Sequence, residues 1–214
     1  MAGMSRFAIL LSGDLMVTPR LHRQIAGARV IAADSGMKHA RALGVMPELW
    51  VGDFDSSGSE LLLDYAHVPR QTHPADKDAT DGEIAVNEAI RLGATEFVLI
   101  GGLGGQSDHG TAHLGLALHL AQSGRRCFIS NGDEEAHPLI AGSYDFDFGA
   151  QSRLSIVPWS DIKGLNLMGV KWPLKDKALT LGSSFTMSNV ALGPVKLSFT
   201  SGIAIAIAYP TQTD

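Results

Sequence analysis

Two carboxylates stand one residue apart in this sequence, directly after an apolar run. Segment 48–60 reads ELWVGDFDSSGSE, so Asp53 and Asp55 follow the apolar residues 49–51 and Gly52. Side chains at positions i and i+2 of an extended chain point to one side, and two such carboxylates repel each other unless a cation lies between them. Mg²⁺ takes oxygen ligands from carboxylates, water and phosphates. The spacing therefore favours a metal site at Asp53 and Asp55, with an acidic turn as the alternative.

Other acidic residues stand where candidate strands end or candidate helices begin. Asp14 and Asp34 each follow an apolar run, Asp78 and Asp81 open a helical segment in DKDATDGEIAV, and Asp108 follows VLIGGLGGQSD. Ligands of an open parallel sheet bind outside the carboxyl ends of its strands. Turn or helix-cap roles are the alternative, and for Asp14 and Asp34 taken alone they are the favoured interpretation.

A glycine-rich segment, IGGLGGQSDHG at 100–110, follows one candidate strand and precedes a helix. Backbone N–H groups and a helix N-terminus at such a place favour anions, so the segment is a candidate phosphate site. It matches neither the P-loop nor the dinucleotide fingerprint G-x-G-x-x-G. Lys77, beside Asp78, is a candidate phosphate contact, with a solvated lysine as the alternative.

The histidines and serines give little support to two other kinds of chemistry. The chain has eight His, and none stands at a zinc-ligand spacing with Cys or in H-E-x-x-H. His109 and His113 are four residues apart and are expected to be ordinary residues of one helix face. Since no G-x-S-x-G elbow occurs, Ser–His–Asp hydrolysis has no support.

The elements that position these residues show two different sequence patterns, one before and one after about residue 134. Apolar runs without period-two alternation, typical of strands covered on both faces, predict strands near 7–13, 29–35, 48–54, 96–102 and 126–132. Helical spacing occurs between them at 19–28, 37–44, 59–66, 80–93 and 109–124. This alternation predicts a parallel sheet with right-handed crossovers.

After about residue 134 the apolar runs become short and often alternating, with Gly, Pro, Asn or Asp between them. They lie at 143–149, 152–159, 165–172, 177–184, 194–202 and 203–210. Such runs predict an all-β sandwich or partial barrel. We therefore expect an α/β domain over 1–134 and a β-sandwich domain over 135–214.

Composition limits the partners. The 214 residues are 45% hydrophobic and 18% charged, enough apolar material for a substantial core. A formal net charge of −5 argues against a nucleic-acid partner, although a divalent cation can still bring in a small phosphorylated ligand. The single cysteine, Cys127, excludes an intrachain disulfide and is expected to be a buried packing residue. No apolar run is long enough to span a membrane, so we expect no membrane partner and a cytoplasmic location.

Four segments occur in the order seen in thiamine pyrophosphokinases: ADSGMKHARALGVMPELWVGDFDS, KDATDGEIAV, GGLGGQSDH and WPLKDKALTLGSSFTMSN. From about Ala32 to its end the chain resembles that family. The resemblance implies an α/β nucleotide-binding domain followed by a β-sandwich, in a homodimer. It also implies transfer of the pyrophosphoryl group of ATP to the hydroxyl of thiamine, which gives thiamine diphosphate and AMP.

The resemblance also implies roles for individual residues. Asp53, Asp55 and Asp78 would hold Mg²⁺ on the phosphates of ATP, with Asp81 and Asp108 close by, and one of these last two would orient the hydroxyl or accept its proton. The nucleotide site would be lined by Asp34, Ser35, Gly36, Lys77, Gly102, Gly104 and Gly105. The thiamine pocket, across the dimer interface, would be built from Trp172, Ser183, Ser184, Ser188 and Asn189. An aromatic face suits the cationic thiamine, although Trp172 taken alone would be read as a core residue.

The chain departs from the family pattern at three positions. Gln106 stands where the family usually has Arg, His113 where it often has Asn, and Ser35 where it has Gly. Loss of the Arg removes a bidentate phosphate donor. The candidates to replace it are Lys38, Lys77 and Arg41.

Three rival functions remain open from the sequence. One is a pyrophosphokinase acting on another heterocyclic alcohol, such as a hydroxymethylpterin. The second is a Mg²⁺-dependent phosphohydrolase with water as the acceptor. The third is a non-catalytic module that senses thiamine or a nucleotide, and the complete set of acidic residues argues against it.

Overall fold

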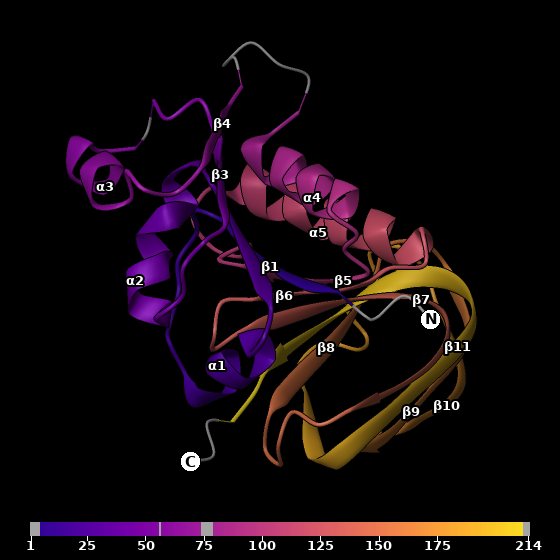
Figure 1. Ribbon diagram of the computed structural model, residues 1–214. Helices are drawn as coiled ribbons and strands as arrows, with labels where there is room; N and C mark the ends of the chain where they lie inside the picture. Colours follow the sequence, from indigo (N-terminus) through magenta and orange to yellow (C-terminus); the bar gives the residue numbers. More distant parts are fainter. Residues whose placement is uncertain (1–4, 56, 74–78, 212–214) are drawn as a thin grey trace. The chain divides into compact units, whose positions relative to one another are not determined.

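The computed structural model describes residues 5–55, 57–73 and 79–211 (Figure 1). The chain divides into two compact units. The α/β unit consists of Met1–Leu116 and Arg125–Gly132, and the β unit of Ala117–Gly124 and Asp133–Asp214. The predicted combination of a parallel-sheet α/β part with a β-rich C-terminal part is confirmed. Within the described ranges, no helix has the length and apolar character needed to cross a membrane.

The α/β unit is built on a parallel sheet whose strand order is β6-β5-β1-β2-β3-β4. The strands are β1 (Arg6–Leu10), β2 (Arg29–Ala33), β3 (Leu49–Gly52), β4 (Arg70–Thr72), β5 (Glu96–Ile100) and β6 (Arg126–Ser130). The chain moves outward from β1 to β4 and then returns to β5 on the other side of β1. This reversal makes the space beyond the carboxyl ends of β1 and β5 the expected ligand crevice. The five predicted strands are confirmed, and β4 is an additional one.

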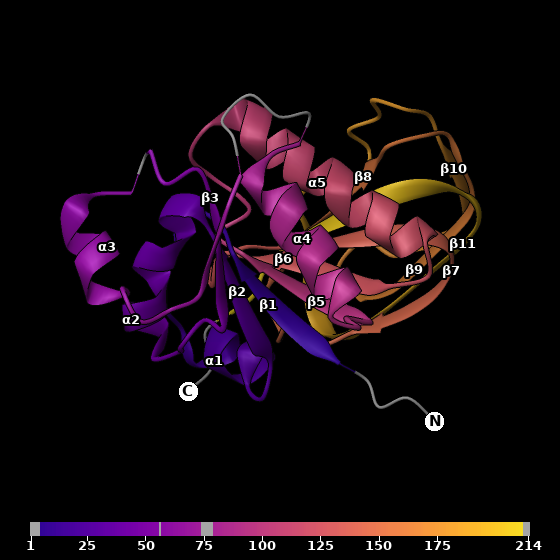
Figure 2. The same cartoon turned by 45° about the horizontal axis from the view of Figure 1, so that its top comes forward.

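Helices cover both faces of this sheet, as Figures 1 and 2 show for α1 and α2 on one side and α4 on the other. The helices are α1 (Pro19–Ile25), α2 (His39–Leu43), α3 (Ser59–Asp64), α4 (Asp81–Arg91), α5 (Ser107–Gln122) and the 3₁₀ helix η1 (Asp34–Lys38). Side chains of β1 alternate between the faces, so Ala8 and Leu10 pack in one cluster with Leu21 of α1 and Leu43 of α2. This packing fixes the positions of the strands, and with them the positions of the loops that follow their carboxyl ends.

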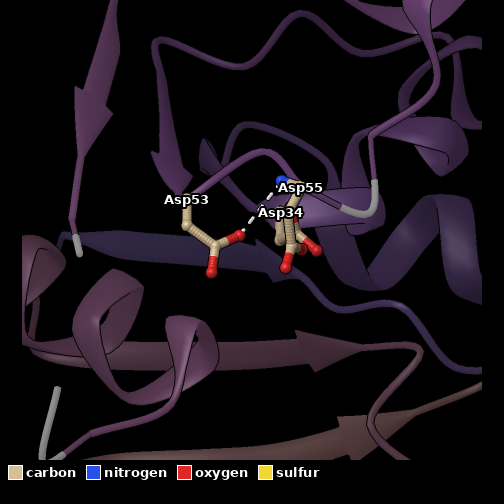
Figure 3. Close-up of side chains that lie close together, drawn as sticks. All are labelled: Asp34, Asp53 and Asp55. Carbon is tan, nitrogen blue, oxygen red and sulfur yellow. Dashed lines mark hydrogen bonds between the residues drawn. The ribbon is translucent and has the colours of Figure 1, made fainter. Parts of the chain in front are cut away.

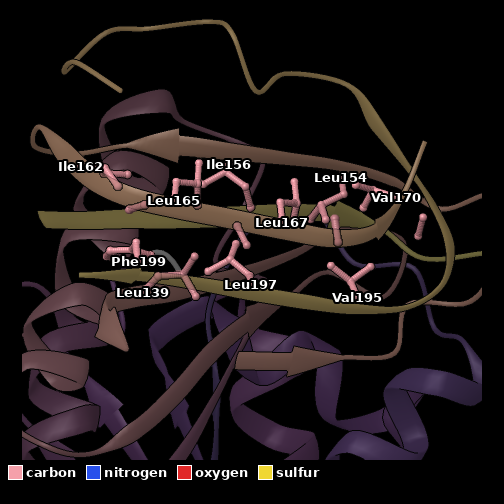
Figure 4. Close-up of a cluster of buried hydrophobic side chains, with 14 of the residues drawn as sticks. Leu139, Leu154, Ile156, Ile162, Leu165, Leu167, Val170, Val195, Leu197 and Phe199 are labelled. Carbon is pink, nitrogen blue, oxygen red and sulfur yellow. The ribbon is translucent and has the colours of Figure 1, made fainter. Parts of the chain in front are cut away.

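The β unit is antiparallel, with the order β10-β9-β11-β7 and β8 paired with β11. Its strands are β7 (Glu135–Phe146), β8 (Arg153–Pro158), β9 (Ile162–Val170), β10 (Leu174–Leu179) and β11 (Asn189–Tyr209). One face of each strand contributes to an apolar core that includes Leu139, Ile156, Leu165 and Leu197 (Figure 4). The alternating runs after residue 134 predicted this arrangement, and β7 begins eight residues before the run that predicted it.

The expectation of two separate strands at 194–202 and 203–210 is wrong, because both runs belong to the 21-residue strand β11. The pairing register of β11 with β7 shifts between Phe199 and Ile203. Beyond this irregularity β11 exchanges β9 for β8 as its second neighbour. The polar and glycine residues that suggested a turn therefore mark a bulge within one strand.

Candidate active site

Three carboxylates meet at the ends of neighbouring strands. Oxygen atoms of Asp34, Asp53 and Asp55 all lie within 4.8 Å of one another, and we call these residues the aspartate cluster (Figure 3). Asp34 directly follows β2 and Asp53 directly follows β3, and these two strands pair in parallel. Gly52 permits the close approach, because a Cβ on it would stand 3.2 Å from the Cα and Cβ of Asp34.

Local backbone geometry fixes the orientation of the cluster. The backbone N–H of Asp55 donates to Oδ1 of Asp53 at 3.1 Å. Phe54 and Asp34 have left-handed φ values of 66° and 43°, a conformation that costs roughly 1–2 kcal/mol for a residue with a side chain. Buried Trp50 donates its indole N–H to the carbonyl of Asp34 at 2.8 Å. The buried core of the unit thus holds Asp34 in place.

The aspartate cluster has the donor chemistry of a site for a hard cation. Mg²⁺ holds its oxygen ligands at about 2.1 Å, so two ligand oxygens stand roughly 3 to 4 Å apart. The ligand oxygens of the cluster lie within 4.8 Å of one another, which is close to this range. Asp53 and Asp55 were both predicted as metal ligands, whereas Asp34 was predicted to line the nucleotide site. Asp78, the third predicted ligand, and Lys77 lie outside the described residues.

Beside the cluster lies a cavity of about 430 Å³, which we call the acidic cavity. It is lined by Leu11, Ser12, Ala33, Asp34, Asp53, Ala79, Thr80, Asp81, Gly82, Glu83, His109 and His113. The N-terminus of α4 forms one wall, and Thr80 caps this helix by accepting from the N–H of Glu83 at 3.2 Å. Asp81, a predicted catalytic residue, is the first residue of α4. The remaining N–H groups of a first helical turn favour an anion.

A second cavity of about 390 Å³, the glycine cavity, shares residues with the first. It is lined by Ser12, Gly13, Asp34, Ser35, Gly101, Gly104, Gly105, Gln106, His109 and His113. Ser35, Gly104 and Gly105 were predicted to line the nucleotide site, and they meet here. Both cavities have the size of a small-molecule site. Because they share Ser12, Asp34, His109 and His113, one extended ligand can contact both.

The segment 101–106 between β5 and α5, which we call the glycine loop, is held by the residue after β6 and by the loop after β1. Asn131, which is buried, accepts from the N–H of Leu103 at 3.1 Å and donates its amide to the carbonyl of the same residue. The N–H of Gly13 donates to the carbonyl of Gly101 at 3.0 Å. Lys38 donates to the carbonyl of Ser12 at 2.6 Å, so this candidate replacement for the missing Arg lies beside both cavities. No sequence pattern predicted this role for Asn131, which is 28 positions from Leu103.

Some of the described residues that were predicted for the nucleotide and catalytic sites line neither cavity. A Cβ on Gly36 would stand 2.2 Å from the carbonyl oxygen of Leu10, and one on Gly102 would stand 2.6 Å from Ile129. These two glycines allow close packing. Asp108, the second residue of α5, is exposed, and its carboxylate accepts from the N–H of His109 at 2.9 Å.

The histidines of α5 have a different environment from the one predicted. His109 and His113 line both cavities, and their ring centroids lie 6.4 Å apart. His113 is buried, and its Nδ1 lies 3.0 Å from the carbonyl oxygen of Gly102. Burial is the largest effect on the pKa of His113 and lowers it. The hydrogen bond to Gly102 raises this pKa in part, and the nearby His109 lowers it further. The spacing of four residues indicated that His109 and His113 share a helix face. That this face lies at the cavities follows only from the fold.

In the β unit, a pocket of about 440 Å³ has an aromatic wall, and we call it the tryptophan pocket. It is lined by Trp172, Leu174, Phe185, Thr186, Met187, Ser188 and Asn189. Trp172 is 53% exposed, which excludes the core role that it would have been given alone. Ser183 and Ser184, also predicted for this pocket, are not among the residues that line it. Asn189 is buried and hydrogen-bonded to the backbone of Trp172.

Two family models and a curated relative match this chain. The family model described as thiamin pyrophosphokinase, catalytic domain, matches residues 24–129, and the model described as thiamin pyrophosphokinase, vitamin B1 binding domain, matches residues 145–204. A thiamine pyrophosphokinase of Bacillus subtilis is 28% identical over 182 residues, which cover 83% of this chain and 85% of that relative.

Solved structures of similar proteins have the same fold. The crystal structure of thiamine pyrophosphokinase from Bacillus subtilis matches with a TM-score of 0.86 at 25% identity, over 96% of this chain and 99% of that one. The structure of thiamin pyrophosphokinase from Geobacillus thermodenitrificans matches with a TM-score of 0.81, also at 25% identity, over 98% of this chain and 99% of that one.

Proposed function

The chain belongs to the thiamine pyrophosphokinase family, and from that premise we propose how it transfers the pyrophosphoryl group of ATP to the hydroxyl of thiamine. The observation that supports this proposal is the position of the aspartate cluster at the edge of two adjoining cavities, beside a glycine loop and the N-terminus of α4. In this reaction the alcohol oxygen forms a bond to the β-phosphorus. The bond from that phosphorus to the oxygen bridging to the α-phosphate breaks, and AMP leaves with the bridging oxygen.

We propose that Asp34, Asp53 and Asp55 hold Mg²⁺, together with Asp78 as the resemblance implies. Bound there, the ion neutralises charge on the phosphates as the bridging and leaving oxygens become more negative. ATP is strongly anionic, and an acidic cavity would repel it without such a cation. The glycine loop and the first turn of α4 then supply N–H donors to the phosphate oxygens. Positioning of the alcohol in line with the β-phosphorus accounts for much of the remaining catalysis.

We propose that the tryptophan pocket binds thiamine. Trp172 is exposed, as are Phe185 and Met187 in the same pocket, and the ammonium of Lys171 lies 4.7 Å from the centroid of the Trp172 ring. A flat cationic ligand is stabilised by an aromatic face.

Exposed apolar side chains at a pocket are also typical of a surface covered by a second subunit. We therefore propose a homodimer in which the pocket of one copy serves the cavities of the other. We also propose a cytoplasmic location, with which a chain of one cysteine and hence no intrachain disulfide is consistent.

One assay separates this function from its rivals. Purified protein with ATP and Mg²⁺ is offered thiamine, a hydroxymethylpterin or water alone, and the products are identified by mass spectrometry. We expect AMP and thiamine diphosphate only when both thiamine and Mg²⁺ are present. Formation of ADP, or AMP formation that does not depend on thiamine, would exclude the proposal. Activity with the pterin alone would select the first rival, and binding without turnover would select the sensing module.

The proposed dimer has its own test. Asp53→Asn removes a carboxylate of the aspartate cluster, and Trp172→Ala removes the aromatic wall of the tryptophan pocket. If each active site draws on two copies, mixing the two inactive variants under subunit exchange restores part of the activity, because some sites then combine two intact parts. No restoration, with exchange verified by mass spectrometry of the mixed dimer, would place both parts in one chain.

A further inference from the structure

Ser12 carries two hydrogen-bond donors that have no partner within the described part of the chain. It lies two residues beyond β1, and it lines both the acidic cavity and the glycine cavity. Neither its backbone N–H nor its hydroxyl makes a hydrogen bond with a described residue. Ser12 is also exposed. Both donors are therefore available to a ligand that occupies the cavities.

The residue after Ser12 fixes the loop that carries these donors. The N–H of Gly13 donates to the carbonyl of Gly101 at 3.0 Å, and the carbonyl of Gly13 accepts from Nε2 of buried His39 at 2.9 Å. A Cβ on Gly13 would stand 2.4 Å from the carbonyl oxygen of Gly101, so the loop packs closely against the glycine loop. Because its backbone is already ordered, Ser12 can bind a ligand without the cost of ordering a loose segment.

The ammonium of Lys38 brings a positive charge to the same residue. Its Nζ donates to the carbonyl of Ser12 at 2.6 Å. An ammonium has three N–H donors, so this bond leaves others for a ligand. Lys38 is the last residue of η1, is exposed, and lines neither cavity itself. Its contact with Ser12 nevertheless places its charged end beside a residue that lines both.

The charges around the two cavities make this ammonium significant. The described residues that line them include neither lysine nor arginine, and they include four acids, Asp34, Asp53, Asp81 and Glu83. A strongly anionic ligand is repelled by such acids, so it needs positive charge in addition to that of a bound metal ion. Backbone N–H, hydroxyl and ammonium groups are also the donors that phosphate oxygens accept from.

We propose that Ser12 and Lys38 together bind one phosphate group of ATP, an inference that rests on the proposed function and extends its phosphate site. The N–H and the hydroxyl of Ser12 donate to oxygens of this phosphate. The ammonium of Lys38 donates to the same phosphate and keeps its bond to the carbonyl of Ser12. Because Ser12 and Asp34 both line the two cavities, this phosphate lies where the cavities adjoin. The pair supplies there the positive charge that Gln106, which also lines the glycine cavity, lacks.

Direct binding to the full chain tests the pair without turnover. Isothermal titration calorimetry measures the Kd of Mg·ATP and of magnesium tripolyphosphate, a probe that has three linked phosphates and no nucleoside. Ser12→Ala removes the hydroxyl, and Lys38→Gln removes the charge. We expect each variant to raise both Kd values about tenfold, as the loss of a hydrogen bond to a charged group does. The matched controls are Ser59→Ala and Lys163→Gln, the same substitutions at exposed positions that line neither cavity. They should bind both ligands as the wild type does.

A rescue variant separates contact with the phosphate from support of the loop. Gln106→Arg places a guanidinium in the glycine cavity and does not restore the bond to the carbonyl of Ser12. If Lys38 binds the phosphate, Gln106→Arg should recover most of the affinity that Lys38→Gln loses, and it should improve the wild type much less. Equal gains in both backgrounds would show that Lys38 acts only by holding the loop. The affinity of Lys38→Gln should also fall less steeply with added salt than that of the wild type, since one charge contact fewer is screened.

The failures of the two proposals are distinguishable. If Ser12→Ala and Lys38→Gln bind both ligands as tightly as the wild type, this inference is overturned, while thiamine-dependent AMP formation by the wild type still supports the proposed function. If both variants lose affinity as expected but the wild type forms no AMP with thiamine and Mg²⁺, the proposed function fails and the phosphate site stands.

Discussion

The carboxamide of Asn189 holds the backbone of Trp172 at both of its polar groups. Oδ1 accepts from the N–H of Trp172 at 3.1 Å, and Nδ2 donates to its carbonyl at 2.8 Å. Oδ1 also accepts from the N–H of Val190 at 2.9 Å. Asn189 was predicted as a polar contact to thiamine. These bonds indicate that it positions the tryptophan, since most of its hydrogen-bonding capacity is already used.

We therefore predict that Asn189→Ala weakens the thiamine site by loosening Trp172. Buried groups left unpaired cost about 1–3 kcal/mol, so we expect unfolding by urea to show a loss of this size. The KM for thiamine should rise severalfold and the KM for ATP should not. The control is Asn166→Ala, at a half-buried asparagine of the β unit outside the tryptophan pocket. A rise in the KM for ATP alone would contradict the assignment.

The second prediction concerns the aspartate cluster. Without a cation, the carboxylates of Asp34, Asp53 and Asp55 repel one another. Asp53→Asn removes one charge and keeps an oxygen that can accept from the N–H of Asp55. Its Tm in a metal-free, low-salt buffer should equal or exceed that of the wild type. Mg²⁺ should raise the Tm of the wild type and leave the variant almost unchanged, as followed by differential scanning calorimetry.

The control for this second prediction is Glu60→Gln, at an exposed acid of α3. It should respond to Mg²⁺ as the wild type does. An equal Mg²⁺ response in Asp53→Asn would remove this residue from the metal site.

The parts of the fold that follow from local pattern were predictable. The apolar runs of the parallel sheet were long and unbroken, so all five were found. β4 has only three residues, Arg-Gln-Thr, none of them apolar, and no pattern rule identifies such an edge strand. β11 was divided in two because a bulge and a turn share the same residue types.

The residues of the site also divide into those that a local pattern predicted and those that depend on the fold. Asp53 and Asp55 are close in sequence, so their spacing predicted a cation. The proximity of Asp34 depends on the parallel register of β2 and β3, which places Ala33 beside Val51. The roles of His113 and Asn131 depend on which helix face and which strand end meet the glycine loop. Such long-range relationships are fixed by the packing of the sheet and cannot be read from one segment.

The third prediction tests the support of the glycine loop by Asn131. Asn131→Ala removes both hydrogen bonds to Leu103, so we expect the KM for ATP to rise about tenfold while the KM for thiamine changes little. Asn131→Asp should be worse, because its carboxylate faces the carbonyl of Leu103 without a donor. Steady-state kinetics with each substrate varied in turn measures both effects. Equal changes in both KM values would indicate general destabilisation.

The fourth prediction concerns the carboxylate of Glu88, which joins α4 to the edge strand β4. Glu88 accepts from Gln71 at 3.0 Å and from Arg91 at 2.8 Å. The Gln71 hydrogen bond is the largest effect that lowers the pKa of Glu88, followed by the Arg91 hydrogen bond. A carboxylate whose pKa is lower in the folded than in the unfolded state stabilises the fold above the unfolded pKa. That stability is lost as pH falls through the lower folded value.

Glu88→Gln should accordingly be less stable than the wild type at pH 7, by about 1 kcal/mol. The difference should shrink as pH falls below about 4.3, the ordinary pKa of glutamate. Urea unfolding between pH 3 and pH 7 measures it. Most of the effect should belong to Gln71, because the Arg91 side chain is 68% exposed and exposed ion pairs contribute little. Gln71→Ala should then show nearly the same pH dependence of stability as Glu88→Gln. Arg91→Ala should change the pH dependence of the wild type only slightly. The reverse order would show that the ion pair on the surface of α4, and not the link to β4, lowers the pKa.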